Sequence, residues 1–142
     1  YAKVFLGDSG SYLLGFLVSI MAISIHKLDL SISPIFYAIL LYYAFFEVFF
    51  SYFRKIYYRV SPFYPDKYHM HMIMYRLINR SLDNNPKSNF MASIACNLFY
   101  LFTISPSYFF YNNDTLCLIY FFILMILYSA LYSLLAFYDR KI

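Results

Sequence analysis

The chain has 142 residues, of which 63% are hydrophobic, 25% are aromatic and only 13% are charged. An ordinary soluble domain carries about 25% charged residues, so this composition excludes that class and predicts a membrane protein. The net charge of +4 comes from basic residues gathered at one membrane face with no soluble domain behind them. We therefore interpret this charge as a signal of topology, which excludes a nucleic-acid-binding surface.

A polar segment at residues 7–11, Gly-Asp-Ser-Gly-Ser, precedes an apolar run that begins near residue 12. Glycine adopts positive φ without steric cost, so a turn here lets backbone N–H groups approach a phosphate or a sugar closely. Asp8 supplies the hard oxygen ligand that Mg²⁺ prefers, and Mn²⁺ is the alternative metal. The segment predicts a turn at the membrane surface, in which Gly7, Ser9 and Gly10 bind a phosphorylated substrate and Asp8 binds the metal.

Four apolar segments are candidates to cross a bilayer as helices, which takes about 20 residues each. They lie near residues 12–25, 35–53, 90–110 and 116–138, and the first can extend through residues 9–11 and to His26. The predicted fold is therefore all-α: a polytopic integral membrane helical bundle of about four transmembrane helices and one cytoplasmic amphipathic helix. Residues 1–142 are expected to be the C-terminal part of a single membrane domain.

The basic residues predict how these spans are oriented. All of the eleven Lys and Arg residues except Lys27 lie on one side of the membrane if the N-terminus is cytoplasmic. The positive-inside rule then places both termini and the loop 54–89 in the cytoplasm, and Asn113 outside. This loop is the one long polar stretch of the sequence, so we expect function at the cytoplasmic face of the membrane.

The second half of the loop predicts an amphipathic helix. Pro62 and Pro65 keep the chain extended, and Asp66 stands where a helix N-cap is expected. Apolar residues then repeat at helical spacing: Met70, Ile73, Met74, Leu77 and Ile78. His69, Arg76 and Arg80 share another face, which predicts an interfacial helix whose basic side binds phosphate.

His69 and His71 leave three interpretations open. On a regular helix their side chains point roughly 200° apart and cannot both face one ion, whereas in an irregular first turn they can. In one interpretation both are interfacial side chains that touch lipid headgroups. In another, one or both bind substrate phosphate or handle a proton near neutral pH. A structural zinc site is the least supported, because the loop has no cysteine.

Glu47 is a charged residue inside the second predicted span. An intramembrane carboxylate is costly and is a functional hypothesis by default. The alternative is a buried structural partner for Arg54 or Lys55, and the sequence does not separate the two interpretations.

These motifs resemble the polyprenyl-phosphate N-acetylhexosamine-1-phosphate transferase family. Residues 4–11 followed by Leu-Gly-Phe at 14–16 are similar to one family signature. Ser61-Pro62, Pro65-Asp66 and His69-Met70-His71 resemble the second, and Glu47 ahead of Arg54 is similar to the acidic span that leads into it. The matches occur in the family's order and cover most of residues 4–76.

The resemblance implies a membrane enzyme that transfers a sugar-1-phosphate from a UDP-N-acetylhexosamine to polyprenyl (undecaprenyl) phosphate and releases UMP. Such enzymes make precursors of cell-envelope polysaccharide or peptidoglycan. By analogy, Asp8 is the Mg²⁺ ligand, and His69 and His71 lie in the nucleotide-sugar and diphosphate pocket. The expected catalytic residues are therefore Asp8, His69 and His71, and the expected substrate-binding residues are Gly7, Ser9, Gly10, Asp66 and Arg76.

The sequence departs from the family pattern in two places. Met72 stands where the family has a further histidine, and nothing matches the family's aspartate pair, which lies upstream of the first signature. We therefore expect this chain to be the C-terminal part of an enzyme whose N-terminal half is missing here, and to be inactive alone. The alternatives are an inactive family member or a non-enzymatic membrane scaffold or transporter component.

Overall fold

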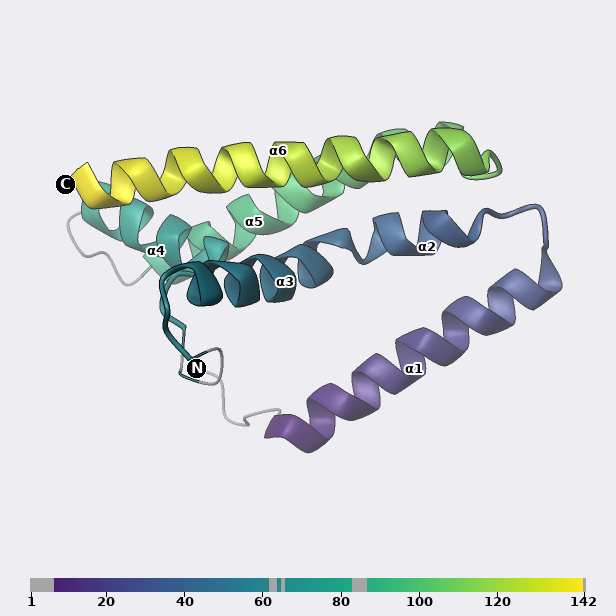
Figure 1. Cartoon of the computed structure of the whole chain (residues 1–142), viewed down its shortest axis with the longest axis horizontal. Coiled ribbons are helices and arrows are strands. Elements are labelled where there is room, and N and C mark those ends of the chain that lie inside the picture. The colour runs from purple at the N-terminus through teal and green to yellow at the C-terminus, as the bar shows by residue number, and fades with distance from the viewer. Residues whose placement is uncertain (1–6, 62–63, 65, 83–86, 142) are drawn as a thin grey trace.

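A computed structural model describes residues 7–61, 64, 66–82 and 87–141, with the side chains of Arg140 and Lys141 excepted. Within these ranges the regular structure is helical, and the successive helices run back and forth along one long axis (Figure 1). The elements are α1 (Gly7–Leu28), α2 (Pro34–Leu40), α3 (Tyr42–Tyr57), α4 (Met70–Ser81), α5 (Ser88–Ile104), η1 (Ser105–Phe109) and α6 (Asp114–Lys141).

The described helices confirm the all-α polytopic membrane bundle. Three segments, Gly7–Leu28, Ser88–Phe109 and Asp114–Asp139, are long and apolar enough to cross a membrane. A fourth span is complete if the bent pair α2 and α3 counts as one. The predicted amphipathic helix is α4, which buries Met70 and Ile73. The loop predicted at 54–89 is shorter, because α3 extends to Tyr57 and α4 lies inside it.

The second span is broken, where the sequence predicted one helix over 35–53. Helices α2 and α3 are bent by 71° at Leu41. The hydroxyl of Tyr100, in α5, donates a hydrogen bond to the carbonyl of Leu40, the last residue of α2. A side chain that inserts into the backbone hydrogen-bond ladder is a known cause of a sharp kink, and here it comes from another helix.

The other spans also differ at their ends from the predicted 90–110 and 116–138. Helix α5 ends at Ile104 and continues as the 3-10 helix η1, because Pro106 lacks the N–H that an α-helical bond needs. Helix α6 is longer than predicted and begins at Asp114. The predicted pattern of about four spans agrees with the structure when the bent pair α2 and α3 counts as one span, but its details depend on single residues within and beside the apolar runs.

Helix α1 starts earlier than predicted, at Gly7 rather than near residue 12. The prediction of a turn over residues 7–11 was therefore wrong beyond its first residue. Gly7 has φ 65°, in the left-handed region that glycine adopts freely. The Ser11 hydroxyl then donates to the Gly7 carbonyl at 2.9 Å, one helical turn back. Residues 4–6 of the resemblance, Lys3, Pro62 and Pro65 lie outside the described residues.

The core lies between α2, α3, α4 and α6, and α1 lies apart from it (Figure 1). No side chain of α1 is buried. The core cluster consists of Ile39, Tyr42, Phe46, Met70, Ile73, Cys117, Leu124, Tyr128 and Tyr132. Thr103 of α5 connects two of the helices that bound this core: its hydroxyl lies 2.5 Å from the Tyr42 hydroxyl, and its carbonyl accepts from the Tyr120 hydroxyl at 2.6 Å.

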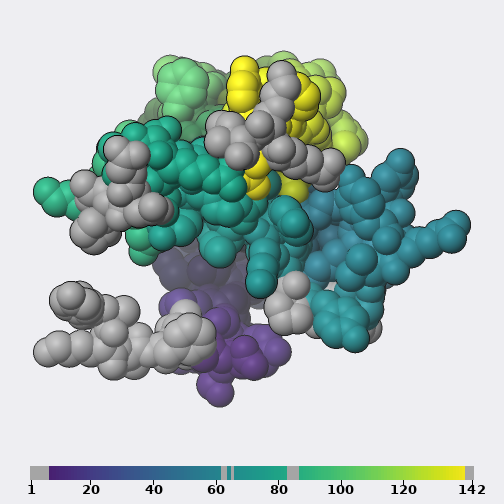
Figure 2. All heavy atoms as spheres, turned by 90° about the vertical axis from the view of Figure 1, so that its left-hand side faces the viewer, coloured from purple at the N-terminus to yellow at the C-terminus, as the bar shows by residue number. Residues whose placement is uncertain are grey.

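The two ends of the molecule bring together different segments of the chain. The start of α1, the end of α3, helix α4 and the end of α6 lie at one end, which faces the viewer in Figure 2. The connection from α1 to α2 and the turn before α6 lie at the other end, where Ser33 N–H donates to the Tyr111 carbonyl at 2.9 Å. The fold therefore brings Asp8 and the histidine-containing segment to the same end.

Candidate functional site

Glu47 contacts the start of α4, and this contact organises the site. Its side chain is buried in α3. One carboxylate oxygen accepts the backbone N–H of Met70 at 2.9 Å, and the other lies 2.7 Å from Nδ1 of His69. Glu47 is thus paired, as one of the two interpretations required, but its partners are at the start of α4 and are neither Arg54 nor Lys55.

The N-cap of α4 is His69, not Asp66 as predicted. His69 has extended backbone angles, φ −64° and ψ 147°, and its own side chain makes no capping hydrogen bond. The carboxylate of Glu47 satisfies the exposed Met70 N–H instead, at the helix end that favours negative charge. A cap supplied by a residue 23 positions earlier explains why local sequence signals put the cap in the wrong place.

The two histidine rings stack against one another, with centroids 5.6 Å apart and planes at 9°. This requires the irregular first turn that the sequence left open. The hydrogen bond to Glu47 raises the pKa of His69 above its ordinary value, while burial opposes the rise. Among the described residues, Nε2 of His69 and the His71 imidazole have no hydrogen-bond partner. Both remain available to an anion, and the three interpretations of the pair remain possible.

Arg54 and Asp66 form a second paired group beside the histidines. Their ion pair is mostly buried, with 14% and 5% of the side chains exposed. The Arg54 guanidinium also donates to the Tyr68 carbonyl at 2.7 Å and to the Tyr132 hydroxyl, and lies 5.5 Å from each of those rings. Burial pushes the pKa of Asp66 up, but hydrogen bonds from Ser51 and the Tyr68 N–H, with the Arg54 charge, hold it below its ordinary value.

The basic face of α4 contacts the end of α6. Arg76 donates through Nε and Nη2 to the Asp139 carboxylate at 2.5 to 3.1 Å. Arg80 pairs with the same carboxylate at 3.3 Å. The remaining donor of Arg76 reaches the Lys67 carbonyl at 2.7 Å. Arg76 and Arg80 do share a face, as predicted, and that face joins α4 to α6, but His69, which was predicted on the same face, precedes the helix and contacts Glu47.

Asp8 is placed differently. It is exposed in the first turn of α1, with Ser9 and Gly10 beside it. Its carboxylate makes no hydrogen bond or ion pair with any part of the chain that the structure describes. Across those residues, no three His, Cys, Asp or Glu side chains are close enough together to hold a metal ion. Asp8 therefore shares an end of the molecule with His69 and His71 without joining their cluster.

A large apolar groove runs beside the Arg54–Asp66 pair. It has a volume of about 1060 Å³ and lies between the end of α3, the following loop, α4 and α6. Phe50, Phe53 and Phe137 are among its aromatic walls, and the side chains of Lys55 and Lys67 lie along it. Asp66 and Asp139 also line it, so the groove combines aromatic walls with charged side chains of both signs.

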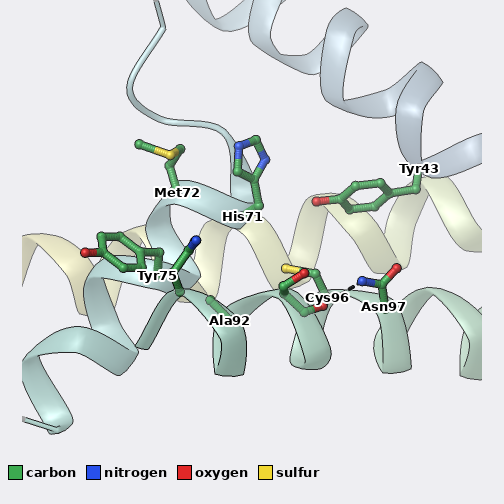
Figure 3. A pocket seen from close by; sticks show the side chains of 9 residues that line it. Tyr43, His71, Met72, Tyr75, Ala92, Cys96 and Asn97 are labelled. Atoms are coloured by element: carbon green, nitrogen blue, oxygen red, sulfur yellow. Dashed lines mark hydrogen bonds between the residues drawn. The ribbon is translucent and has the colours of Figure 1, made fainter. Parts of the chain in front are cut away.

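A smaller pocket of about 510 Å³ lies on the other side of α4, between α3 and α5. Figure 3 shows Tyr43 of α3 and His71 of α4 above Cys96 and Asn97 of α5. Met72, which departs from the pattern of the resembled family, also lines this pocket. His71 is thus the histidine that contacts open space, whereas His69 contacts Glu47.

One comparison with known proteins connects the chain to an enzyme. It is 38% identical over 79 residues to an undecaprenyl-phosphate alpha-N-acetylglucosaminyl 1-phosphate transferase of Thermotoga maritima. The match covers 56% of this chain and about a quarter (26%) of the relative's length. No protein-family model and no solved structure matches the chain. The similarity supports a relation to the polyprenyl-phosphate sugar-phosphate transferases.

The sequence indicated both histidines, Asp66 and the arginines as site residues, and their roles stay predictions, but it did not reveal the partners that they contact. The Glu47–His69 contact joins residues 22 positions apart, and the Arg76–Asp139 contact joins residues 63 apart. One signal was present for each contact. Glu47 is an acid inside an apolar span, and Asp139 is an acid at the end of another. Both require a cation or another donor nearby, because an unpaired charge is costly there.

Proposed function

We propose that this chain is part of a membrane enzyme that transfers N-acetylhexosamine-1-phosphate from a UDP-sugar to polyprenyl phosphate and releases UMP. The observation that carries the proposal is the 38% identity over 79 residues to a transferase named for undecaprenyl phosphate and N-acetylglucosaminyl 1-phosphate. The membrane bundle and the anion-binding groups at one end are consistent with that chemistry.

The large groove supports the lipid acceptor. A polyprenyl chain is apolar over its whole length and ends in a phosphate. The groove offers aromatic walls for the apolar chain and the side chains of Lys55 and Lys67 for the phosphate, while the carboxylates of Asp66 and Asp139 that also line it are paired with Arg54 and Arg76. The Lys67 ammonium has no partner among the residues that the structure describes, so it is free to pair with a phosphate. Because polyprenyl phosphate is a lipid dissolved in the bilayer, it can reach a site between membrane helices.

The histidine pair supports the donor diphosphate. An imidazolium N–H donates charge-assisted hydrogen bonds to phosphate oxygens, which are stronger than neutral ones. His69 and His71 present unpaired ring nitrogens side by side. Phosphoryl transfer depends mainly on positioning and on neutralising phosphate charge, so a covalent enzyme intermediate is unnecessary.

Asp8 fits the Mg²⁺ that this reaction implies, with Mn²⁺ as the alternative. Mg²⁺ in such sites binds one or two carboxylates and completes its shell with water and substrate phosphate oxygens. Asp8 offers one exposed carboxylate with no competing partner among the described residues, which suits that arrangement. When bound, the ion would neutralise charge on the diphosphate; Asp8 would anchor it at the start of α1.

We place the active face in the cytoplasm, because the fold gathers the start of α1, α4 and the end of α6 at one end (Figure 2) and the basic residues follow the positive-inside rule. Single cysteines at Lys67 and Asn113, in a variant with Cys96 and Cys117 replaced, can be probed in intact cells with an impermeant thiol reagent. We expect labelling at Asn113 alone. Labelling at Lys67 alone contradicts this topology.

The proposed reaction is tested with the purified full-length protein in detergent or nanodiscs. UDP-N-acetylglucosamine, undecaprenyl phosphate and Mg²⁺ or Mn²⁺ are added, and UMP and the lipid product are measured. We expect both products to form in equal amounts. A protein that is folded and releases no UMP from any UDP-N-acetylhexosamine contradicts the proposal. Residues 1–142 alone are expected to be inactive.

A further inference from the structure

The carboxylate of Glu47 uses both of its oxygens, and each holds a different part of the start of α4. One accepts the Met70 N–H at 2.9 Å and the other contacts His69 Nδ1 at 2.7 Å. Glu47 lies inside the bent second span, 11% of its side chain is exposed, and placing a charge there is costly. Two hydrogen bonds and a neighbouring cation are the kind of contacts that offset such a cost.

The contact fixes the state of His69. A carboxylate only accepts hydrogen bonds, so Nδ1 of His69 must carry the proton between them. The second ring nitrogen, Nε2, is then the one left for another molecule. It has no partner among the described residues, and 29% of the side chain is exposed. When the ring is protonated, Nε2–H is a charged donor held in one orientation.

The neighbouring histidine lacks this arrangement. The His71 ring stacks on His69 at 5.6 Å but makes no hydrogen bond within the described chain, and it lines the smaller pocket. The two histidines of the motif are therefore not equivalent. One is oriented by a buried acid, and the other is oriented only by stacking and by its place in the first turn of α4.

We propose that Glu47 is a positioning residue that acts through His69, holding Nδ1 and the Met70 N–H so that Nε2 of His69 is presented to a substrate phosphate beside His71. The inference rests on the proposed transferase function for the identity of the phosphate. Its structural part, an imidazole oriented and charged by a buried carboxylate, does not depend on that function.

Other charged groups also act on His69. Asp66, in the loop before α4, favours the protonated ring, and Arg54, in α3, opposes it. His71, in α4, stacks on the ring. Arg54 and Asp66 are themselves paired, so their influences on His69 largely offset one another. Glu47 therefore sets the direction of the effect, which makes it the residue to change.

The first experiment measures the pKa of His69 directly. Histidines in the full-length protein are labelled with ¹⁵N and ¹³C and followed by NMR over pH, with His69→Gln used to assign the signal. In the wild type we expect Nδ1 to carry the proton and the pKa to lie above the ordinary 6.5 or so. In Glu47→Gln, which keeps an oxygen for Met70 N–H, we expect the His69 pKa to fall back toward its ordinary value.

The second experiment is the pH profile of UMP release. The fall in the His69 pKa should shift the alkaline limb of the profile to lower pH in Glu47→Gln. The rate of UMP release by Glu47→Gln should then be about tenfold or more below the wild-type rate above neutral pH, and the difference should be smaller near pH 6. In Glu47→Asp, which keeps the charge, the alkaline limb should lie nearer to its wild-type pH. A merely structural role would lower activity equally at every pH.

The two readouts separate the inference from the proposed function. An unchanged His69 pKa in Glu47→Gln, or a wild-type ring protonated at Nε2 alone, overturns the inference whatever the activity. A shifted pKa in a protein that releases no UMP supports the Glu47–His69 contact and contradicts the transferase proposal. If Glu47→Gln does not fold, the wild-type tautomer and pKa still decide the matter.

Discussion

The start of α1 and the corner formed by α3, α4 and α6 hold their polar side chains in opposite ways. In the corner, Glu47 pairs with His69, Arg54 with Asp66, and Arg76 with Asp139. At the start of α1, Asp8 is exposed and has no partner in the described chain. Groups that are already paired maintain a structure, whereas an unpaired carboxylate is free to bind. We therefore expect substitutions of the paired groups in the corner to lower stability, with activity also affected at Glu47 and the histidines, whereas a substitution at Asp8 should lower activity and leave stability unchanged.

The largest effect is expected for Asp8→Asn in the full-length protein. Asparagine keeps the shape of the side chain but loses the charge that would hold Mg²⁺. UMP release should fall at least about 100-fold, the upper range for loss of a group that merely supports a metal ligand. Thermal unfolding and membrane insertion should be unchanged. Asp29→Asn, another exposed carboxylate, is the matched control, and near-normal turnover of Asp8→Asn contradicts the assignment.

A stability effect of comparable size is expected for Arg54→Ala. It leaves the buried Asp66 carboxylate unpaired and removes the contacts to Tyr68 and Tyr132. Breaking one partner from a buried ion pair costs about 3–5 kcal/mol of unfolding free energy. Thermal unfolding in nanodiscs measures it. Arg59→Ala is the control, because the Arg59 side chain is exposed and has no partner among the described residues. Equal unfolding midpoints for the two variants would contradict the importance of the pair.

An intermediate effect should distinguish the two histidines. Replacing either by Ala removes a phosphate contact, which costs about 1.5–3 kcal/mol for a hydrogen bond to a charged group. This corresponds to a turnover loss or a rise in KM for the UDP-sugar of about tenfold to 100-fold. Only His69→Ala should also lower the unfolding temperature, because it removes one of the two hydrogen-bond partners of the buried Glu47 carboxylate.

Metal analysis complements the histidine variants. We expect no stoichiometric zinc in the purified full-length protein, because the loop provides neither thiolates nor a third histidine. Zinc that is present in the wild type and disappears in His69→Ala would replace the phosphate interpretation with a structural metal site.

The smallest effect is a dependence of stability on pH. The His69 pKa is raised in the folded protein. The contact with Glu47 therefore stabilises fully below the unfolded pKa of about 6.5, and the contribution is lost as pH rises through the folded pKa. Unfolding of the wild type should become easier over that range. His69→Gln should remove this part of the dependence, and an identical dependence in both proteins would contradict the charged contact.

Much of the fold follows from the sequence. The apolar runs and the repeat of Met70, Ile73 and Leu77 predict the spans and α4, because both depend on local periodicity. The break between α2 and α3 does not follow, because its cause is the hydroxyl of Tyr100, 60 residues from Leu40. The helical start of α1 at Gly7 was also missed, because a glycine-rich polar segment favours a turn when considered alone.

The candidate site, too, could be predicted from the sequence only in part. The histidines and basic residues were identified by type and spacing. The N-cap at Asp66 was wrong, because the chain stays non-helical as far as His69 and Glu47 then supplies the cap. The same helical spacing that grouped Arg76 with Arg80 could not reveal Asp139, which comes from the end of α6. The roles of Asp8, Ser9 and Gly10 remain predictions.

The phenol hydroxyls between the helices have a consequence for how the bundle assembles. In a bilayer the lipid tails are as apolar as leucine or phenylalanine, so burying such side chains gives little preference for one helix neighbour over another. Tyr42, Tyr100 and Tyr120 instead connect α3, α2 and α6 to a short stretch of α5 through directional hydrogen bonds. These three hydroxyls add directional contacts between particular helices, so tyrosine side chains favour particular helix neighbours in a solvent where hydrophobicity gives little such preference.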